Sequence, residues 1–396
     1  MILLKRLGHG AMLYISRLLL SNWRNFRSAD IPLQSRMFIV GPNASGKSNV
    51  LDAIRFLREI AGGGGGLKAA IESRGGVSKV RSLFARDPSD VQVSCELGDE
   101  ESRTPRWKYE LVFNQEGGGI QQLRPIVKSE KVWKESALIY DRAAGPDAND
   151  EDMAAFTRLE QPLGHKPFKE VVDFLSSIRY LHLVPQIVRS SPFFGGRQGE
   201  SFGSDFIARA ATLNNATRSS YLRRISKALQ IAVPQFEGLE LVKDELGRPH
   251  LETTFRHWRP QGAHQWEDQF SDGTVRLVGF LWAILDGQGT VLLEEPELSL
   301  HPAIMRNLAE MIIKLQKRKE GRRQVIATSH SRDLLSSPGI SGEEIATLRP
   351  GENGTEVQIA STDQQIKALL DSGMAPGDVV LPATAPVNVE QLLLEL

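Results

Sequence analysis

The stretch "GPNASGKS", residues 41–48, decides the fold of this 396-residue chain. It matches the pattern G-x-x-x-x-G-K-[ST], in which glycines allow backbone N–H groups to surround phosphate oxygens. The apolar run 36–40 before it predicts a strand, and the periodic run 49–60 after it predicts a helix with one apolar face. A strand, a glycine turn and a helix N-terminus in this order predict a phosphate-binding loop.

The same motif assigns a role to single residues. Lys47 reaches the β- and γ-phosphates of a nucleoside triphosphate, and the Ser48 hydroxyl ligates Mg²⁺. The other loop residues present backbone N–H groups to the phosphates. The residues expected to contact the nucleotide are therefore Gly41, Pro42, Asn43, Ala44, Ser45, Gly46, Lys47, Ser48 and Asn49.

A second stretch, "VLLEEPELSLHP" at residues 291–302, predicts a buried strand that ends in two glutamates. Buried carboxylates need a cationic partner, because desolvating a charge is costly. The magnesium ion of the nucleotide supplies that cation. Successive side chains of a strand point to opposite sides, so we expect different roles for the two residues. Glu294 would bind Mg²⁺ directly or through water, and Glu295 would polarise the attacking water.

Two further stretches flank the acidic strand. Residues 270–285 predict a helix with Ser271 as its N-cap, so Ser271, Asp272 and Gly273 form a second anion-binding helix N-terminus. Since the chain has one phosphate-binding loop, this N-terminus would serve the nucleotide of another subunit; an ordinary capped helix is the alternative. His330 follows the predicted strand 324–329 and would hydrogen-bond the γ-phosphate, unless it is a satisfied surface histidine. The predicted catalytic residues are Lys47, Glu295 and His330.

Composition excludes several classes of protein. Lys plus Arg equals Asp plus Glu at 48 each, which gives no global attraction to nucleic acid. The single cysteine, Cys95, excludes an internal disulfide framework and predicts a packed thiol. The apolar N-terminus is interrupted by Arg17, and no window reaches the ~18 uncharged apolar residues of a membrane helix. We therefore expect a cytoplasmic protein with no membrane partner.

Strands alternate with helices in the last third of the chain, which predicts a mostly parallel sheet covered on both faces. Alternating stretches between residues 91 and 141 predict added antiparallel strands. We expect a flexible loop at 62–66, an exposed loop at 142–153 and a hairpin at 237–258. The predicted organisation is a disordered extension (1–11), the first part of a nucleotide domain (12–186), a helical insertion (187–236), the second part (237–350) and a C-terminal tail (351–396).

The order of these motifs resembles the ABC-type ATPase heads of the RecF/SMC class. "NFRS" at 25–28 and "EEPELSLHP" at 294–302 resemble in particular RecF-like and OLD-type (overcoming lysogenization defect) ATPases. The resemblance covers about 12–60 and 265–335. It implies an α/β P-loop NTPase, an ABC-type head with a mostly parallel core sheet, an antiparallel β subdomain and a helical insertion. It also implies ATP and Mg²⁺ as ligands and a homodimer that encloses two ATP molecules.

The resemblance further implies roles for residues that no motif pattern assigns. Gln186 matches the position of the family's glutamine loop, which contacts magnesium and water. Asn25 and Arg27 would lie near the nucleotide, and His301 would face the opposite subunit. Glu294 departs from the aspartate that is usual at the magnesium position, but the longer carboxylate can still act through water.

Two departures bear on function. The signature reads "SDGT" at 271–274 instead of "SGGQ", which argues against a transporter subunit. Only 66 residues follow His330, too few for the Toprim nuclease domain of OLD proteins. We therefore expect an ATPase that acts as a nucleotide-gated dimerisation switch in DNA repair or anti-phage defence, with a separately encoded effector that is nuclease-like or toxin-like. The alternatives are a transporter's energy-coupling subunit and a non-hydrolysing nucleotide-sensing scaffold.

Two surface features of the sequence each allow two interpretations. The basic runs 314–324 and 221–227 are solvated helix faces or contacts to DNA. The apolar end of the chain is a docking element for a partner or packs on its own head. Its leucines are Leu392, Leu393, Leu394 and Leu396.

Overall fold

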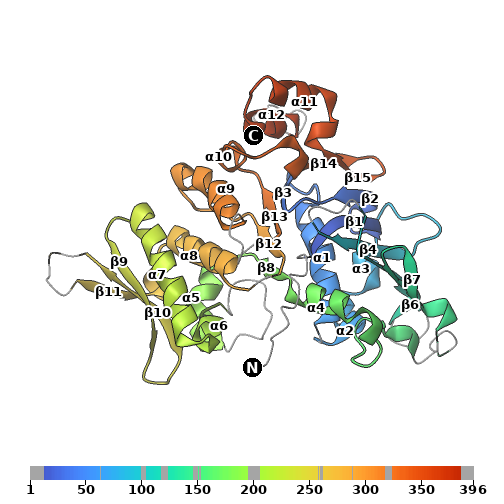
Figure 1. The fold of residues 1–396 in the computed structure, drawn as a ribbon, viewed down its shortest axis with the longest axis horizontal. Coiled ribbons are helices and arrows are strands. Elements are labelled where there is room, and N and C mark those ends of the chain that lie inside the picture. Colours follow the sequence, from blue (N-terminus) through green and yellow to red (C-terminus); the bar gives the residue numbers. More distant parts are fainter. Residues whose placement is uncertain are drawn as a thin grey trace, which may run out of the picture. The chain divides into compact units, whose positions relative to one another are not determined.

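The computed structural model describes residues 13–62, 64–99, 104–116, 124–145, 150, 153–194, 206–256, 258, 262–287, 289–316 and 323–384. These residues fall into two compact units, each formed by several segments of the chain (Figure 1). The first unit comprises Met1–Arg36, Asn43–Ser177 and Leu348–Ile359, and the second comprises Met37–Pro42, Ile178–Thr347 and Ala360–Leu396. The predicted extension 1–11 and the leucines at 392–396 lie outside the described residues.

The first unit contains a six-stranded antiparallel sheet, as the alternating sequence predicts. Burial alternates along its strands, so one face is apolar and packed while the other is half exposed. Cys95 is a free, buried thiol in this sheet, and burial raises its pKa to about 12, which confirms a packed cysteine. The strand order is β2 (Phe26–Pro32), β1 (Tyr14–Trp23), β4 (Val91–Gly98), β5 (Trp107–Gln115), β6 (Pro125–Lys134) and β7 (Ala137–Asp141).

Helix α1 (Lys47–Ala61) packs on the apolar face of this sheet. The ring of Phe56 lies 5.2 Å from that of Trp23 and 5.5 Å from that of Phe113, so one aromatic cluster joins the helix to two strands. The remaining helices of the unit are short: α2 (Gly66–Glu72), α3 (Val77–Val80), α4 (Lys169–Ser177) and the 3₁₀ turns η1 (Arg142–Ala144), η2 (Met153–Ala155) and η3 (Lys166–Phe168).

Two predicted loops of the first unit need correction. Helix α2 begins at Gly66, the last residue of the predicted flexible loop. The exposed loop predicted at 142–153 is wrong at Arg142, which is buried and donates hydrogen bonds to the carbonyl oxygens of Met153 and Phe156. A long side chain with a carbonyl partner at its end can be buried without leaving its charge unsatisfied, and sequence polarity does not reveal this.

The second unit is built on a sheet with the order β14, β3, β13, β12 and β8. Neighbours β8, β12 and β13 run parallel, as do β3 and β14. The expected mostly parallel core is therefore present. The strands are β3 (Arg36–Val40), β8 (Arg179–Leu181), β12 (Val291–Glu294), β13 (Val325–Ser329) and β14 (Ile345–Gly351); the end of β14 pairs with β15 (Gly354–Ile359) in the first unit.

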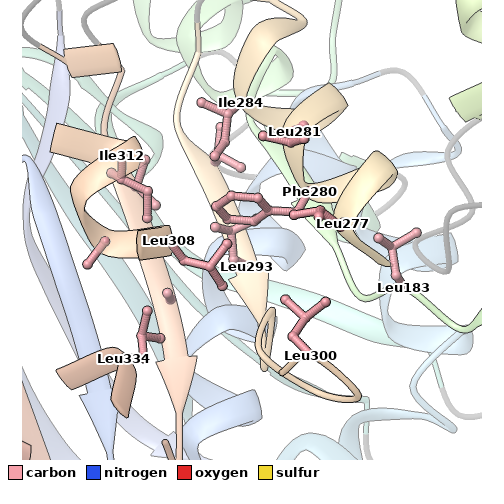
Figure 2. Packing of buried hydrophobic residues seen from close by; sticks show 14 of the residues in the cluster. Leu183, Leu277, Phe280, Leu281, Ile284, Leu293, Leu300, Leu308, Ile312 and Leu334 are labelled. Atoms are coloured by element: carbon pink, nitrogen blue, oxygen red, sulfur yellow. The ribbon is translucent and has the colours of Figure 1, made fainter. Parts of the chain in front are cut away.

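Helices α8 (Asp272–Leu285) and α9 (Pro302–Gln316) bury their apolar faces against this sheet. Figure 2 shows Phe280 of α8 and Leu308 of α9 pointing toward Leu293 of β12. Each such fully buried side chain contributes about 1.5–3 kcal/mol relative to an exposed one. This packing fixes α8 and α9 against β12.

The insertion between β8 and α8 contains helices and a small sheet. Helices α5 (Pro185–Phe194), α6 (Phe206–Thr212) and α7 (Asn215–Ala232) precede the antiparallel strands β9 (Phe236–Lys243), β10 (Pro249–Phe255) and β11 (Ala263–Trp266), and the turn η4 (Glu267–Gln269) follows. Helix α7 runs beside α8 and beside β9 (Figure 1). The predicted hairpin 237–258 thus gains a third strand, β11, from a stretch too short to show an alternating pattern.

The predicted tail is partly folded. After α10 (Arg332–Leu335), η5 (Gly342–Glu344) and β14, the chain forms β15, η6 (Ala360–Thr362), α11 (Gln364–Asp371) and α12 (Pro376–Ala383). Arg332 forms an ion pair with Asp378 that ties α12 to α10. None of the helices in the described ranges combines the length and hydropathy that a bilayer crossing requires.

Candidate functional site

The phosphate-binding loop leaves β3 through Gly41 and Pro42, in the second unit, and continues from Asn43 in the first unit. Gly46 is the N-cap of α1 with a φ of +98°, and no side chain caps this helix. A glycine is required here because side chains rarely adopt that backbone conformation. Lys47 is buried and Ser48 exposed at the helix start. An uncapped helix N-terminus with a glycine turn is the arrangement that binds phosphate.

A neutral hydrogen-bond cluster holds this loop. The amide of Asn25 donates to the carbonyl oxygen of Ser45 at 2.7 Å and to the hydroxyl of Thr355 at 2.5 Å. Its oxygen accepts from the amide of Asn49 at 2.7 Å. The Thr355 hydroxyl donates to the same Ser45 carbonyl at 2.9 Å. A methyl group at Gly46 would lie 2.1 Å from the Asn25 amide nitrogen, so the cluster is packed directly against the loop.

Asn25 therefore donates hydrogen bonds from its side-chain amide to two protein oxygens. Arg27 lies in a different environment. Arg27 lies in β2 at the wall of an open cavity of about 490 Å³ in the first unit. The cavity carries both charge signs. Its lining comprises Ser21, Asn22, Arg27, Ser28, Arg86, Asp87, Pro88, Asn353, Gly354, Thr355 and Glu356.

The acidic strand of the second unit ends differently from the prediction. β12 stops at Glu294, and Glu295 has a φ of +43°, so the chain has already left the strand. The orientation of Glu295 is therefore set by a left-handed turn, and the expected strand alternation does not apply to it. Glu294 accepts a hydrogen bond from the Tyr180 hydroxyl, and His182 Nδ1 lies 3.6 Å from the same oxygen. Tyr180 belongs to β8, and His182 directly follows this strand.

Glu295 is held on its other side. Its backbone N–H donates to the Thr328 hydroxyl at 3.1 Å, which ties the turn to β13. Its carboxylate oxygen Oε1 lies 3.1 Å from His330 Nε2. Burial lowers the pKa of Arg276 on α8, while the nearby charges of Asp272 and Glu295 oppose that shift. Two predicted catalytic residues, Glu295 and His330, are thus in contact.

The predicted second anion site has the expected local structure. Ser271 is the N-cap of α8, and its hydroxyl accepts from the backbone N–H of Thr274 at 3.2 Å, which confirms the cap. The negative charge of Asp272 is compensated by an ion pair, because Arg189 of α5 lies 2.6 Å from its carboxylate. A methyl group at Gly273 would lie 2.7 Å from the carbonyl oxygen of Ser299. The helix N-terminus therefore abuts the turn that follows the acidic strand.

The structure shows the local surroundings of two residues taken from the resemblance, Gln186 and His301. Gln186 is exposed in the first turn of α5, so the expected loop at this position is wrong; the helix starts at Pro185, a favoured first-turn residue. His301 precedes α9, and its Nδ1 accepts from the backbone N–H of Ala303 at 3.2 Å. Contacts of either residue to magnesium or to another subunit stay predictions.

Comparison with known proteins places the chain in a family. A family model described as "AAA domain, putative AbiEii toxin, Type IV TA system" matches residues 36–337, more than half of the chain. The chain belongs to this family. No curated protein matches this AAA-domain chain.

Solved structures similar to this AAA-domain chain are Smc heads. One is an Smc head bound to the C-winged helix domain of ScpA, at 14% identity and a TM-score of 0.51, with 87% of this chain and 97% of that chain covered. Another is an Smc head with an extended coiled coil bound to the C-terminal domain of ScpA, derived from Pyrococcus furiosus, at 14% identity, coverages of 92% and 100% and a TM-score of 0.51. The likeness confirms the predicted fold of an ABC-type ATPase head.

Sequence reasoning missed several residues that contact predicted site residues of this AAA-domain chain. Tyr180 carries no motif, and only the pairing of β8 with β12 brings it to Glu294. Thr355 is 330 residues from Asn25 and shows no signal in the sequence. Glu297 stands inside the quoted acidic stretch, yet its polarity hides the fact that it is buried. Each of these residues meets its partner through tertiary contacts.

Proposed function

We propose that this chain binds ATP with Mg²⁺ through residues 41–49 and hydrolyses it. The observation that carries the proposal is the contact of 3.1 Å between Glu295 and His330 at the carboxyl ends of β12 and β13. A carboxylate beside an imidazole at a strand end can accept a proton from an attacking water and orient that water. The parallel sheet that presents them also contains β3, whose end leads into the phosphate-binding loop.

The residues present suit magnesium. The Ser48 hydroxyl and the Glu294 carboxylate are hard oxygen donors, and Mg²⁺ prefers such ligands together with water and phosphate oxygens. Among the described residues, no group of three or more His, Cys, Asp or Glu side chains is arranged to hold a metal ion alone. Bound magnesium would neutralise charge on the phosphates, while Tyr180 holds Glu294 in place.

Hydrolysis would act as a dimerisation switch. In this proposal two chains enclose two ATP molecules, and Ser271, Asp272 and Gly273 of one chain complete the site of the other. The ion pair between Arg189 and Asp272 supports this, because it compensates a negative charge that would repel phosphate. We further propose a separately encoded effector, in DNA repair or anti-phage defence. The toxin–antitoxin context in the family's description and the Smc-type fold are compatible with that role.

The test uses purified full-length protein with two substitutions and a control. Lys47→Ala should abolish ATP binding. Glu295→Gln should keep ATP affinity within about twofold and lose about 10²–10⁴-fold in turnover, the usual effect of removing a catalytic base. Glu310→Gln, at an exposed position on α9, should match the wild type. Hydrolysis by Glu295→Gln near the wild-type rate would move the catalytic role to another residue, and hydrolysis by Lys47→Ala would refute the site.

The switch needs its own test. Ser271→Arg should leave ATP binding intact and block dimer closure, so homodimers of Ser271→Arg and of Lys47→Ala should both be inactive. A mixed dimer holds one site with both defects and one intact site, so mixing the two variants should restore activity. Mixed dimers that form but stay inactive would show that the signature does not act between subunits.

A further inference from the structure

Glu297 occupies a protected position between the acidic turn and the end of β13. The residue is 6% exposed, and its Oε1 accepts two hydrogen bonds, from the Ser329 hydroxyl at 2.6 Å and from the backbone N–H of His330 at 3.0 Å. Ser329 Oγ in turn accepts from the backbone N–H of Ser331 at 3.0 Å. One carboxylate oxygen thus fixes the backbone of the segment that carries His330.

The other oxygen of this carboxylate has no such partner. Glu297 Oε2 is buried and accepts no hydrogen bond from any described residue. Desolvation by burial, the largest effect, raises the pKa of this carboxyl group. A buried polar atom without a partner costs about 1–3 kcal/mol, but an apolar side chain here would leave the Ser329 hydroxyl and the His330 N–H without their acceptor. The buried carboxylate therefore holds the backbone of the segment that carries one of the two catalytic candidates, His330.

The surrounding contacts close a ring. The Glu295 N–H bonds to Thr328, Glu297 bonds to Ser329 and His330, and the His330 imidazole returns to Glu295. The backbone of His330 therefore cannot shift without breaking the Glu297 contact. We propose that Glu297 is a positioning residue for hydrolysis: by accepting the His330 N–H and the Ser329 hydroxyl, it holds the His330 imidazole against Glu295. This inference rests on the proposed hydrolysis at Glu295.

Activity measurements separate positioning from structure. Glu297→Ala should lower kcat by about 100-fold with ATP affinity unchanged, since misplacing a catalytic group by about 1 Å costs on that order. Glu297→Gln keeps an oxygen that can accept both hydrogen bonds, so it should restore kcat to within about fivefold of wild type. Glu310→Ala on exposed α9 should have no effect. A Glu297→Gln variant as inactive as Glu297→Ala would contradict the acceptor role.

A double-mutant cycle shows whether Glu297 acts through His330. If it does, Glu297→Ala combined with His330→Ala should be no slower than His330→Ala alone. Additive losses would overturn the proposal. His330→Ala at the wild-type rate would overturn it as well, because no imidazole would then need positioning.

Amide hydrogen exchange tests the geometry without any hydrolysis. The His330 N–H, bonded to a buried carboxylate, should exchange slowly in the wild type and in Glu297→Gln, and at least about tenfold faster in Glu297→Ala. If the protein hydrolyses no ATP, the proposed function fails while this measurement still reports on Glu297. Equal exchange in all three proteins would show that Glu297 does not hold the His330 backbone.

Discussion

The phosphate-binding loop and the acidic turn each follow a buried strand, but different chemistry holds them. Neutral groups fix the loop: the amides of Asn25 and Asn49 and the hydroxyl of Thr355. A carboxylate, Glu297, and the ionisable pair of Glu295 and His330 fix the turn. The shape of the loop therefore depends on backbone conformation and space, whereas the shape of the turn depends on charge. Substitutions that change side-chain size should therefore affect the phosphate-binding loop. Substitutions that remove a hydrogen-bond acceptor or change a charge should affect the acidic turn.

Among the variants that test this contrast, Gly46→Ala should have the largest effect. The new methyl group would lie 2.1 Å from the Asn25 amide nitrogen, at a residue with a φ of +98°. Left-handed strain of about 1–2 kcal/mol, together with broken hydrogen bonds of the Asn25 cluster, should raise the Kd for ATP on the order of 1,000-fold. Isothermal titration with ATP measures this change.

Two further variants separate crowding from strain at Gly46. Gly247→Ala adds the same methyl group at a φ of +78° with nothing within 4 Å, so ATP affinity should not change. Adding Asn25→Ala to Gly46→Ala makes room for the methyl group and should recover part of the affinity. If the double variant binds no better than Gly46→Ala, backbone strain alone accounts for the loss.

Glu130 is an exception to this contrast. It lies in the first unit, yet its effect on stability depends on its charge. It accepts hydrogen bonds from the Tyr109 hydroxyl and from the backbone N–H groups of Arg158 and Leu159, and burial raises its pKa from 4.5 to about 7. Between these pH values the unfolded chain releases the proton and the folded chain keeps it. Stability should therefore fall as pH rises from 4.5 to 7, by roughly 3 kcal/mol.

Denaturant unfolding at several pH values measures this slope. Glu130→Gln cannot titrate, so its stability relative to wild type should improve steadily between pH 4.5 and 7. Glu110→Gln, a half-exposed residue on β5, should leave the wild-type slope in place. Parallel curves for Glu130→Gln and wild type would assign the slope to other groups.

A smaller effect is expected for Gly273→Ala on α8. Its methyl group would lie 2.7 Å from the backbone oxygen of Ser299, so the helix N-terminus must move away from the acidic turn. We expect kcat to fall about tenfold with ATP affinity unchanged, since positioning errors affect the reaction more than binding. At Gly279 on the same helix the atoms nearest to a new methyl group belong to the Leu183 side chain and not to backbone, so Gly279→Ala should change kcat less than about threefold. Equal losses in the two variants would point to a general disturbance of the helix.

An effect of similar size should follow from Tyr180→Phe, which removes the hydroxyl that holds Glu294. Groups that orient a metal ligand commonly affect metal affinity about 10- to 100-fold, and with other magnesium ligands present we expect the low end. The Mg²⁺ concentration for half-maximal ATPase activity should rise about tenfold. Tyr221→Phe on α7 keeps that residue's contact with Trp282 and serves as the control. An unchanged magnesium requirement would remove Tyr180 from the site.

Local signals made much of the fold predictable. Glycine spacing, an N-cap serine and short apolar runs predicted the loop at 41–48, helix α8 and strands β12 and β13, because each depends on neighbouring residues. Helices α11 and α12 were not predicted. Each is only eight residues long, so packing decides their structure more than propensity does.

The sequence by itself determined which residues are the candidates for the chemistry: Lys47, Ser48, Glu294, Glu295 and His330 follow from residue type and short-range spacing. Only the tertiary structure decided how these groups are held. Glu295 leaves the strand in a left-handed turn, Glu297 is buried beneath His330, and Tyr180 meets Glu294 through strand pairing. The physical reason is that contacts between residues 33 to 330 positions apart in the chain depend on strand order and packing. Local spacing carries no information about either.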